Sequence, residues 1–481
     1  MTSATTITMQ PTTSRSIPFE LQLDILGYLF TLGRENTSVN LSNFAAVSKS
    51  WQFIVERELF RSLTVNLKNL KEFTSYSKGR THLVKHILLE IFLCKGKTFD
   101  AENSFDFNET CFTKAIQSFF NVLSQWDGHG ITFELGLVSP IQARPASAAT
   151  PQNHSMSVSP RKRSPDLLKK HMRVFELPDD IFFGGRWEDS ESAWHSNATE
   201  LLGLKPLKFQ GRVPPLIPKV RCISKLLVRR RYFPNMAPSS LNVIMGALTC
   251  LEYVHVERWC FTDPGDMYYN YDFVLPPSTK DFSFYNEKDT PYHRRPTAVR
   301  MGADGANLLP VFRGNLENLA ISFVFDAMYI FFSRHNIGYK ILKTLALTSS
   351  RLLLNGHDWR NEMLCHAAEM AKEMPKLEIL ECWYYQTSYQ RPPQGKSSRV
   401  AIFTYRRIDR RTSCISWKST SSFKMSEKTQ TLWKEVVDVE DANFSVEHLT
   451  LDPNLMTSVG AIHDHLALKD RILHGTTWAQ V

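Results

Sequence analysis

The chain has 481 residues, 43% of them hydrophobic and 22% charged, the balance of a globular protein with more than one domain of roughly 100–200 residues. Its longest apolar stretch falls short of the roughly 20 residues that a membrane-spanning helix needs, so no membrane contact is expected. The net charge is +9, but residues 139–173 hold seven Lys and Arg and a single acid, which leaves +3 for the rest and makes nucleic-acid binding an unlikely role for the folded part.

The N-terminal part predicts a disordered tail followed by a helix. Residues 1–15 are rich in Thr and Ser and lack the basic and apolar regions of a signal peptide. A first helix is predicted over residues 18–30, because Pro18 suits a first helical turn. Leu21, Ile25 and Leu29 recur every four residues and form one apolar stripe on this helix.

Two further short helices are predicted before residue 62. Asn40 is a suitable N-cap for the second helix, which would present Leu41 and Phe44 on one side. The third would carry Trp51 and Ile54. Residues 16–62 therefore predict a unit of three helices.

After residue 62, apolar strand-like runs alternate with helical segments. The predicted strands are residues 86–93, 131–137, 223–229, 251–256, 316–323, 342–348, 377–383, 399–407 and 414–418. The predicted helices are residues 108–126, 239–248, 362–374 and 427–437. This alternation is typical of an α/β domain with a mostly parallel sheet, here divided into residues 63–138 and 174–481.

Several of these strands share one texture. "LEYVHV", "LENLAISF", "LKTLALTS" and "LEILECW" each open with Leu and a charged residue, followed by alternating apolar positions. The starts at residues 316, 342 and 377 lie near or above the 20–29 residues of a leucine-rich repeat, and the interval from 251 to 316 leaves room for two units. We expect stacked β-α units in a curved, degenerate leucine-rich-repeat-like sheet, with an ordinary α/β domain as the alternative.

Residues 139–173 are predicted to be a disordered, basic insertion. The segment is rich in Ser, Pro and Ala and has no aromatic ring except that of histidine. Ser159 and Ser164 each precede a Pro, a pattern that proline-directed kinases favour, so we expect phosphorylation there to offset part of the positive charge.

The N-terminal helices resemble the F-box. In that family a Pro-initiated helix with Leu and Ile at helical spacing precedes a Val-Ser-Lys-x-Trp type of turn, which stands here as residues 47–51. This chain has Ile17 where the family usually has Leu. The layout also resembles the F-box proteins common in fungi, in which a long, divergent α/β region with leucine-rich character follows the F-box.

The resemblance implies a substrate-recognition subunit of an SCF-type ubiquitin ligase. The F-box would bind a Skp-type adaptor, which bridges to a cullin, and the C-terminal domain would hold an unknown protein substrate. Adaptor binding is assigned to the following residues: Pro18, Leu21, Ile25, Leu29, Val47 and Trp51. Two alternatives stay open: an F-box scaffold without a role in ubiquitination, and a chromatin- or RNA-associated protein that binds through residues 139–173.

No catalytic motif appears in the sequence, so we expect no enzymatic activity, metal or cofactor. Substrate contact is assigned to an aromatic segment with Tyr268, Tyr269 and Tyr271 and to Arg406 and Arg407, which suit an acidic or phosphorylated target. A second arginine cluster, "VRRRYF", would assist if it reached the same rim of the sheet.

The eight cysteines indicate a reducing compartment. None is spaced CxxC, and most lie in apolar segments, so we expect free thiols rather than disulfides or zinc ligands. The expected location is the cytoplasm, the nucleus or both.

Overall fold

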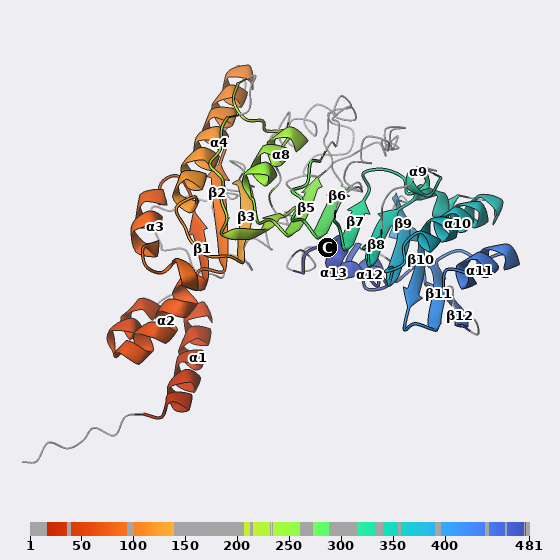
Figure 1. Ribbon diagram of the computed structural model, residues 1–481, viewed down its shortest axis with the longest axis horizontal. Coiled ribbons are helices and arrows are strands. Elements are labelled where there is room, and N and C mark those ends of the chain that lie inside the picture. Colours follow the sequence, from red (N-terminus) through yellow and green to blue (C-terminus); the bar gives the residue numbers. More distant parts are fainter. Residues whose placement is uncertain are drawn as a thin grey trace, which may run out of the picture.

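The computed structural model contains one large sheet with helices on its faces and a group of helices that projects from one end (Figure 1). It describes the following residues: 17–35, 40–93, 101–138, 206–211, 215–230, 232, 234–259, 273–287, 315–332, 340–354, 357–389, 396–437, 442–456, 459–475 and 477. Residues 1–15 and 139–173, for which disorder is predicted, lie outside these ranges.

Three helical segments form the N-terminal unit, which we define as residues 17–61. They are α1 (Phe19–Glu35), the 3-10 helix η1 (Leu41–Ala46) and α2 (Lys49–Arg61). The Asn40 side chain accepts the Ser42 backbone N–H at the start of η1, and Ser48 accepts the Trp51 N–H at the start of α2. Both residues satisfy backbone donors that have no partner within the helix.

The twelve strands lie in the sheet in their order along the chain. They are β1 (Ser62–Val65), β2 (His86–Phe92), β3 (Ile131–Val138), β4 (Ile223–Val228), β5 (Tyr253–Trp259), β6 (Asp281–Glu287), β7 (Asn318–Ser322), β8 (Thr344–Thr348), β9 (Ile379–Tyr389), β10 (Lys396–Arg407), β11 (Thr412–Ser419) and β12 (Asn443–Thr450). Each pair from β1 to β9 is parallel. β10 is antiparallel to both β9 and β11, and β12 is parallel to β11.

Helices cover the sheet unequally. The remaining helices are α3 (Leu70–Ser77), η2 (Thr81–Leu83), α4 (Ala101–Leu123), α8 (Pro238–Ala247), α9 (Met328–Phe331), η7 (Ser350–Leu353), α10 (His357–Lys372), α11 (Glu427–Lys434), α12 (Val459–His463) and α13 (Lys469–Ile472). Figure 1 shows α4, α8 and α10 on one face, here called the outer face, and α12 and α13 on the opposite, inner face.

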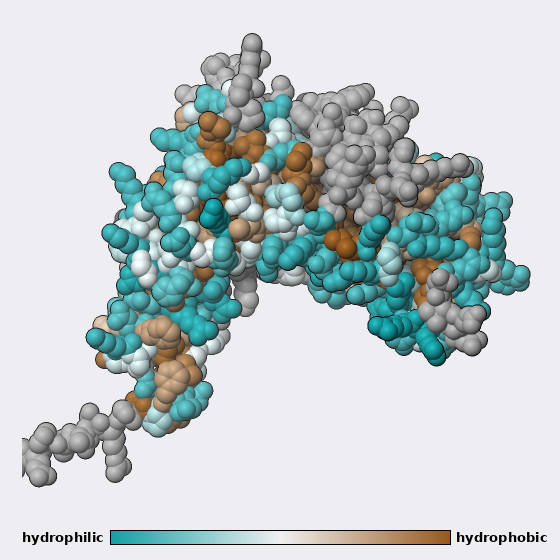
Figure 2. Space-filling view, in the orientation of Figure 1, coloured by the Kyte–Doolittle hydropathy of each residue, from teal (hydrophilic) through white to brown (hydrophobic). Residues whose placement is uncertain are grey.

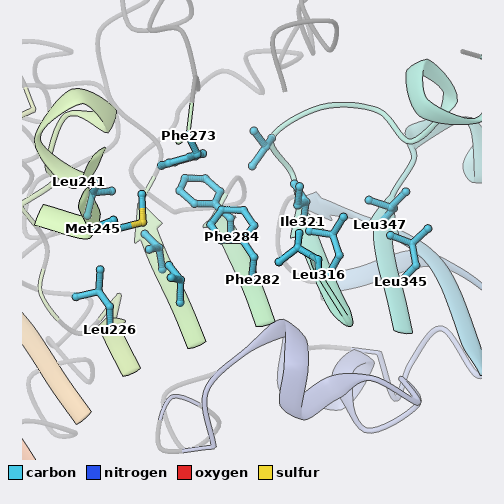
Figure 3. Close-up of a cluster of buried hydrophobic side chains, with 14 of the residues drawn as sticks. Leu226, Leu241, Met245, Phe273, Phe282, Phe284, Leu316, Ile321, Leu345 and Leu347 are labelled. Atoms are coloured by element: carbon cyan, nitrogen blue, oxygen red, sulfur yellow. The ribbon is translucent and has the colours of Figure 1, made fainter. Parts of the chain in front are cut away.

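The two faces differ in composition because side chains alternate along each strand. One register row runs across the outer face through apolar residues: Val254, Phe282, Leu319, Leu345, Leu380 and Tyr405. The next row, on the inner face, is small or polar: His255, Ser283, Ala320, Ala346, Glu381 and Thr404. Figure 3 shows Phe282, Ile321 and Leu345 on the α8 side of the sheet, away from α12 and α13. The main core therefore lies between the outer face and its helices.

The predicted repeating texture corresponds to a repeating structure. Leu251, Leu316, Leu342 and Leu377 are all buried just before a strand. The charged residues that stand at the same position of successive units are joined by backbone hydrogen bonds. In each bond the N–H of the later residue donates to the carbonyl of the earlier one, and the residues in order are Glu252, Lys280, Glu317, Lys343 and Glu378. β6 occupies the interval between residues 251 and 316, which had left room for a second unit.

Some elements were absent from the sequence-based predictions. They are β1, α3, η2, β6, α9, η7, β12, α12 and α13, and α4 begins seven residues before its predicted start at residue 108. β1, α12 and α13 have only four or five residues each, too few to produce a recognisable period.

Candidate interaction surfaces

The N-terminal unit has a small interior of its own. α1 packs against η1 and α2, and Leu26 of α1 and Val55 of α2 are fully buried. The Ser50 hydroxyl donates to the Gln22 side-chain oxygen across 2.7 Å, which ties α1 to α2. Leu26 is therefore the residue of α1 that faces the unit's interior, although the predicted stripe ran beside it.

The predicted stripe instead faces outward. The exposed fractions of Leu21, Ile25 and Val47 are 52%, 41% and 62%, and Pro18 is also exposed. Leu29 and Trp51 are half-buried, with the Trp51 ring 6.3 Å from that of Phe44. Four of the six predicted adaptor-binding residues thus lie on an open surface, and two stand partly in the interior.

The open surface is larger than the stripe. Eight of the eighteen exposed large hydrophobic side chains among the described residues lie in the N-terminal unit, and five of them were not predicted as site residues: Ile17, Phe19, Leu23, Tyr28 and Phe53. Figure 2 shows the resulting brown patch over α1 and α2. We call all eight residues the N-terminal apolar surface. They are the five just named together with Leu21, Ile25 and Val47. Such a concentration of exposed apolar groups is typical of a surface that binds another macromolecule.

The N-terminal unit joins the sheet without an intervening loop. α2 ends at Arg61 and β1 begins at the next residue. The Arg80 guanidinium, beyond α3, forms a 2.9 Å ion pair with Glu56 of α2. Hydrogen bonds from Arg80 and Gln52 lower the pKa of the Glu56 carboxyl. The unit is therefore held to the sheet by both the chain and a side-chain contact.

A series of hydrogen bonds links the first four strands on the inner face. The buried Glu134 carboxylate accepts two N–H groups of Arg229 and lies 2.9 Å from Nε2 of His86. Because a carboxylate can only accept, Nε2 of His86 donates to it, and Nδ1 of the same ring lies 2.9 Å from the Ser62 hydroxyl oxygen. The charged groups of this series neutralise each other, which permits their burial.

The C-terminal segment, residues 451–477, lies across the inner face of the central strands. Ile462, Leu466 and Leu473 pack on Tyr285 and Trp383 in a second, separate apolar cluster. This packing closes the middle of the inner face to solvent.

Two buried carboxylates hold the backbone of this segment. Glu257 of β5 accepts the His474 N–H at 2.7 Å and the Thr477 hydroxyl at 2.7 Å. Burial raises the pKa of Glu257, but hydrogen bonds from His255, His474 and Thr477 outweigh burial and lower the pKa to about 2. The Glu257 carboxylate is thus strongly stabilised in its charged form.

Glu381 of β9 is the second carboxylate that holds the segment, but burial and hydrogen bonding affect its pKa differently from that of Glu257. It accepts the N–H groups of Ala467 and Leu468 at 2.7 and 2.9 Å. Burial raises the pKa of Glu381, and the hydrogen bonds only partly offset this effect. A salt bridge from Arg471 to Asp281, 2.7 Å long, adds a third polar link between the segment and the sheet.

The predicted substrate-binding residues are only partly described. Arg406 is exposed at the end of β10, and Arg407 is half-buried with its Nη1 donating to the Pro375 carbonyl. Tyr268, Tyr269 and Tyr271 lie outside the described residues, as do Ser159 and Ser164. No contact between the tyrosines and the arginines is therefore available to support a joint site.

The two arginine clusters do not reach the same rim of the sheet. Arg229 and Arg230 follow β4, and both are buried. β10 runs antiparallel to β9, and Arg406 pairs with Ile379 at the beginning of β9. Arg229 and Arg230 therefore lie at the carboxyl ends of the parallel strands, and Arg406 lies at the opposite ends, where those strands begin.

The described part of the chain contains neither a membrane-spanning helix nor a metal-binding cluster. None of its helices combines the length and apolar character that a bilayer-crossing helix requires. It also contains no group of three or more His, Cys, Asp or Glu side chains arranged to hold a metal ion. All six cysteines within the described ranges carry free thiols.

Comparison with known proteins identifies one partial similarity. Residues 274–474, which contain the elements from β6 to α13, match a family of unknown function, DUF6546. The match includes the C-terminal segment on the inner face and leaves out the N-terminal unit. No curated protein and no solved structure matches the chain.

Proposed function

We propose that the chain is the substrate-recognition subunit of an SCF-type ubiquitin ligase. The N-terminal unit would bind a Skp-type adaptor, and the sheet domain would bind the target. The observation that carries the proposal is the N-terminal apolar surface: Leu21, Ile25 and Val47 stay open although the unit has filled its own interior with Leu26 and Val55.

The size of this surface accounts for a large part of the energy that docking requires. Complete burial of a Leu, Ile or Phe side chain contributes about 1.5–3 kcal/mol, so covering a half-exposed one contributes about 1 kcal/mol. Eight such side chains then give about 8 kcal/mol before the entropy of association is subtracted. This gross value is sufficient for micromolar or tighter binding only if hydrogen bonds and additional contacts contribute as well.

The motif that resembles the F-box also has a local role. Ser48, within the Val-Ser-Lys-x-Trp stretch, caps α2, and Trp51 stands on the first turn of that helix. Val47 precedes the cap and is exposed. The stretch thus turns the chain between η1 and α2 while presenting an apolar residue outward, as an adaptor-binding turn requires.

The sheet domain supports the second half of the proposal. Consecutive β-α units that pair only with their chain neighbours are the arrangement of a leucine-rich-repeat-like domain, which we propose here in a degenerate form. Its role would be to raise the effective concentration of a target lysine near a ubiquitin-charged conjugating enzyme, without catalysis by this chain.

Adaptor capture provides the test. Ile25→Asp would place a carboxylate within the covered surface, and we expect it to weaken binding of a purified Skp-type adaptor by about a hundredfold or more, because an unpaired buried charge is strongly unfavourable. Leu354→Asp is the matched control, since Leu354 is 40% exposed and Ile25 41% exposed. Equal adaptor binding by the Ile25→Asp variant and the control would refute the proposal.

Gene deletion and truncation distinguish the two remaining alternatives. A scaffold without a ligase role would bind the adaptor but leave target levels unchanged when the gene is deleted. A chromatin- or RNA-associated protein would lose its partner on removal of residues 139–173, with no dependence on Ile25.

A further inference from the structure

The last strand of the sheet has an open edge. β12 stands at one end of the strand order, and among the described residues it pairs only with β11. Eight consecutive residues of β12 pair with β11 without a bulge, and six of the eight are exposed. Figure 1 shows β12 at the end of the sheet farthest from the N-terminal unit.

The hydrogen-bond phase identifies the free backbone groups. The Asn443 N–H donates to the Arg411 carbonyl, and the Leu451 N–H donates to the Ser419 carbonyl. Residues alternate between the two sides of a strand, so the odd-numbered residues of β12 bond to β11. The N–H and C=O groups of Phe444, Val446, His448 and Thr450 therefore point away from the sheet.

Among the described residues, nothing gives this edge the usual protection against strand addition. Proteins commonly block an exposed edge with Pro, Lys, a bulge or a very short strand. The stretch "NFSVEHLT" contains no Pro, Lys or Arg, and its pairing is regular. The opposite edge strand, β1, is protected by its length of four residues. β12 is thus the edge of the sheet that is suited to receive another strand.

Exposed arginines lie beside the beginning of β12. Arg406 shares a register row with Cys414 and Ser445, the latter in β12. Arg410 and Arg411 are exposed in the β10–β11 turn. Asp409, the acid of this turn, accepts the backbone N–H of Arg411 and of Thr412 and so stabilises the turn.

The direction of an added strand follows from these positions. Antiparallel pairing is somewhat more stable per residue than parallel pairing. A strand antiparallel to β12 has its carboxyl end beside Asn443, where the β10–β11 turn supplies positive charge. Acidic residues at that end would meet Arg410 and Arg411, and the guanidinium group suits carboxylates.

We propose that β12 binds an extended peptide segment of a target protein as an added antiparallel strand, with acidic residues at the segment's carboxyl end on the arginines of the β10–β11 turn. That the segment belongs to a ubiquitination target rests on the proposed function. Binding of the segment itself depends only on the edge and the arginines.

A designed peptide tests the backbone contact. The probe is a fluorescein-labelled peptide in which Thr and Val alternate over six residues, followed by two Glu, and its binding to the full chain is measured by fluorescence anisotropy. His448→Pro removes an outward N–H and leaves the β11 ladder intact, because proline is tolerated on that side of an edge strand. We expect His448→Pro to weaken binding about tenfold, and His448→Ala to stay within about twofold of the unaltered chain.

A second comparison tests the charge contact. Replacing both Arg410 and Arg411 by Gln should weaken binding of the probe about tenfold at low salt and remove most of its salt dependence. A peptide of the same composition with its two Glu at the amino end should bind the unaltered chain more weakly than the probe.

Three results would overturn this proposal. They are failure of the probe to bind the unaltered chain, equal binding by His448→Pro and His448→Ala, and a dimer in solution that His448→Pro dissociates, which would make a second copy the occupant. Adaptor capture is measured separately, and His448→Pro should leave it unchanged. Loss of adaptor capture in the unaltered chain would instead refute the proposed function alone.

Discussion

Replacement of Glu257 by Gln should release the C-terminal segment from the inner face. The carboxylate accepts four groups: Nε2 of His255, the backbone N–H groups of His474 and Arg230, and the Thr477 hydroxyl. A glutamine has the same shape but keeps one acceptor oxygen, so two of these donors would face an NH₂ group. Hydrogen bonds to charged groups contribute about 1.5–3 kcal/mol each, which sets the expected loss at about 3 kcal/mol or more.

The pKa of Glu257 leads to a similar magnitude. It lies at about 2 in the folded chain, against an ordinary value of 4.5. A difference of about 2.5 units corresponds to about 3 kcal/mol of stability. Since the folded pKa is the lower one, this stability is fully present above pH 4.5 and disappears as the pH falls through about 2.

Hydrogen exchange of the last residues measures the effect locally. At pH 7 the His474 amide of the Glu257→Gln variant should exchange roughly a hundredfold faster than in the unaltered chain, and at pH 3 only about tenfold faster. Glu381→Gln is the control, because burial raises the pKa of Glu381 and the charged form contributes less. Equal exchange at pH 7 in the Glu257→Gln variant and the unaltered chain would refute the anchoring role.

Two more predictions concern the core. Gly136→Ala should destabilise the chain by about 1–3 kcal/mol in chemical unfolding, because its Cβ would overlap the Tyr232 ring, whereas Gly246→Ala in α8 has open space and should be neutral or stabilising by up to about 1 kcal/mol. Greater stability of the Gly136→Ala variant would contradict the close approach of the Tyr232 ring to Gly136. Burial raises the pKa of Cys222 to about 11 and that of Cys382 well above its usual value, so neither thiol should react with a thiol reagent at pH 8 before unfolding, while the half-buried Cys250 should react sooner. Labelling of Cys382 at the rate of Cys250 would show that the core between the outer face and its helices opens readily.

Local periodicity was sufficient to predict most of the elements. Strands such as β2 and β8 were expected close to their observed bounds, because alternating apolar residues bounded by polar ones leave few other structures. β6 escaped detection because Thr279 stands where the other units have a leucine, although it is equally buried. β12 escaped because an edge strand needs no continuous apolar pattern.

The candidate surfaces were less predictable than the elements. Periodicity identified an apolar stripe on α1 but did not show that Leu26, beside the stripe, fills the interior of the unit while Leu21 and Ile25 stay exposed. Which face of α1 becomes buried depends on where η1 and α2 pack against it, and the turn between η1 and α2 determines that position. The separation of the two arginine clusters was likewise not predictable, because it results from the antiparallel direction of β10.

Residue order alone thus determined the helices, the strands and the recurrence of the β-α unit, since each depends on neighbours within a few positions. Only the tertiary structure decided that the C-terminal segment closes the inner face and that β12 remains an open edge. Both outcomes depend on contacts between residues far apart in the chain, such as the 217 positions that separate Glu257 from His474. Such contacts leave no periodic trace in the sequence, because a single carboxylate among apolar residues looks the same whether its partner is solvent or a distant backbone N–H.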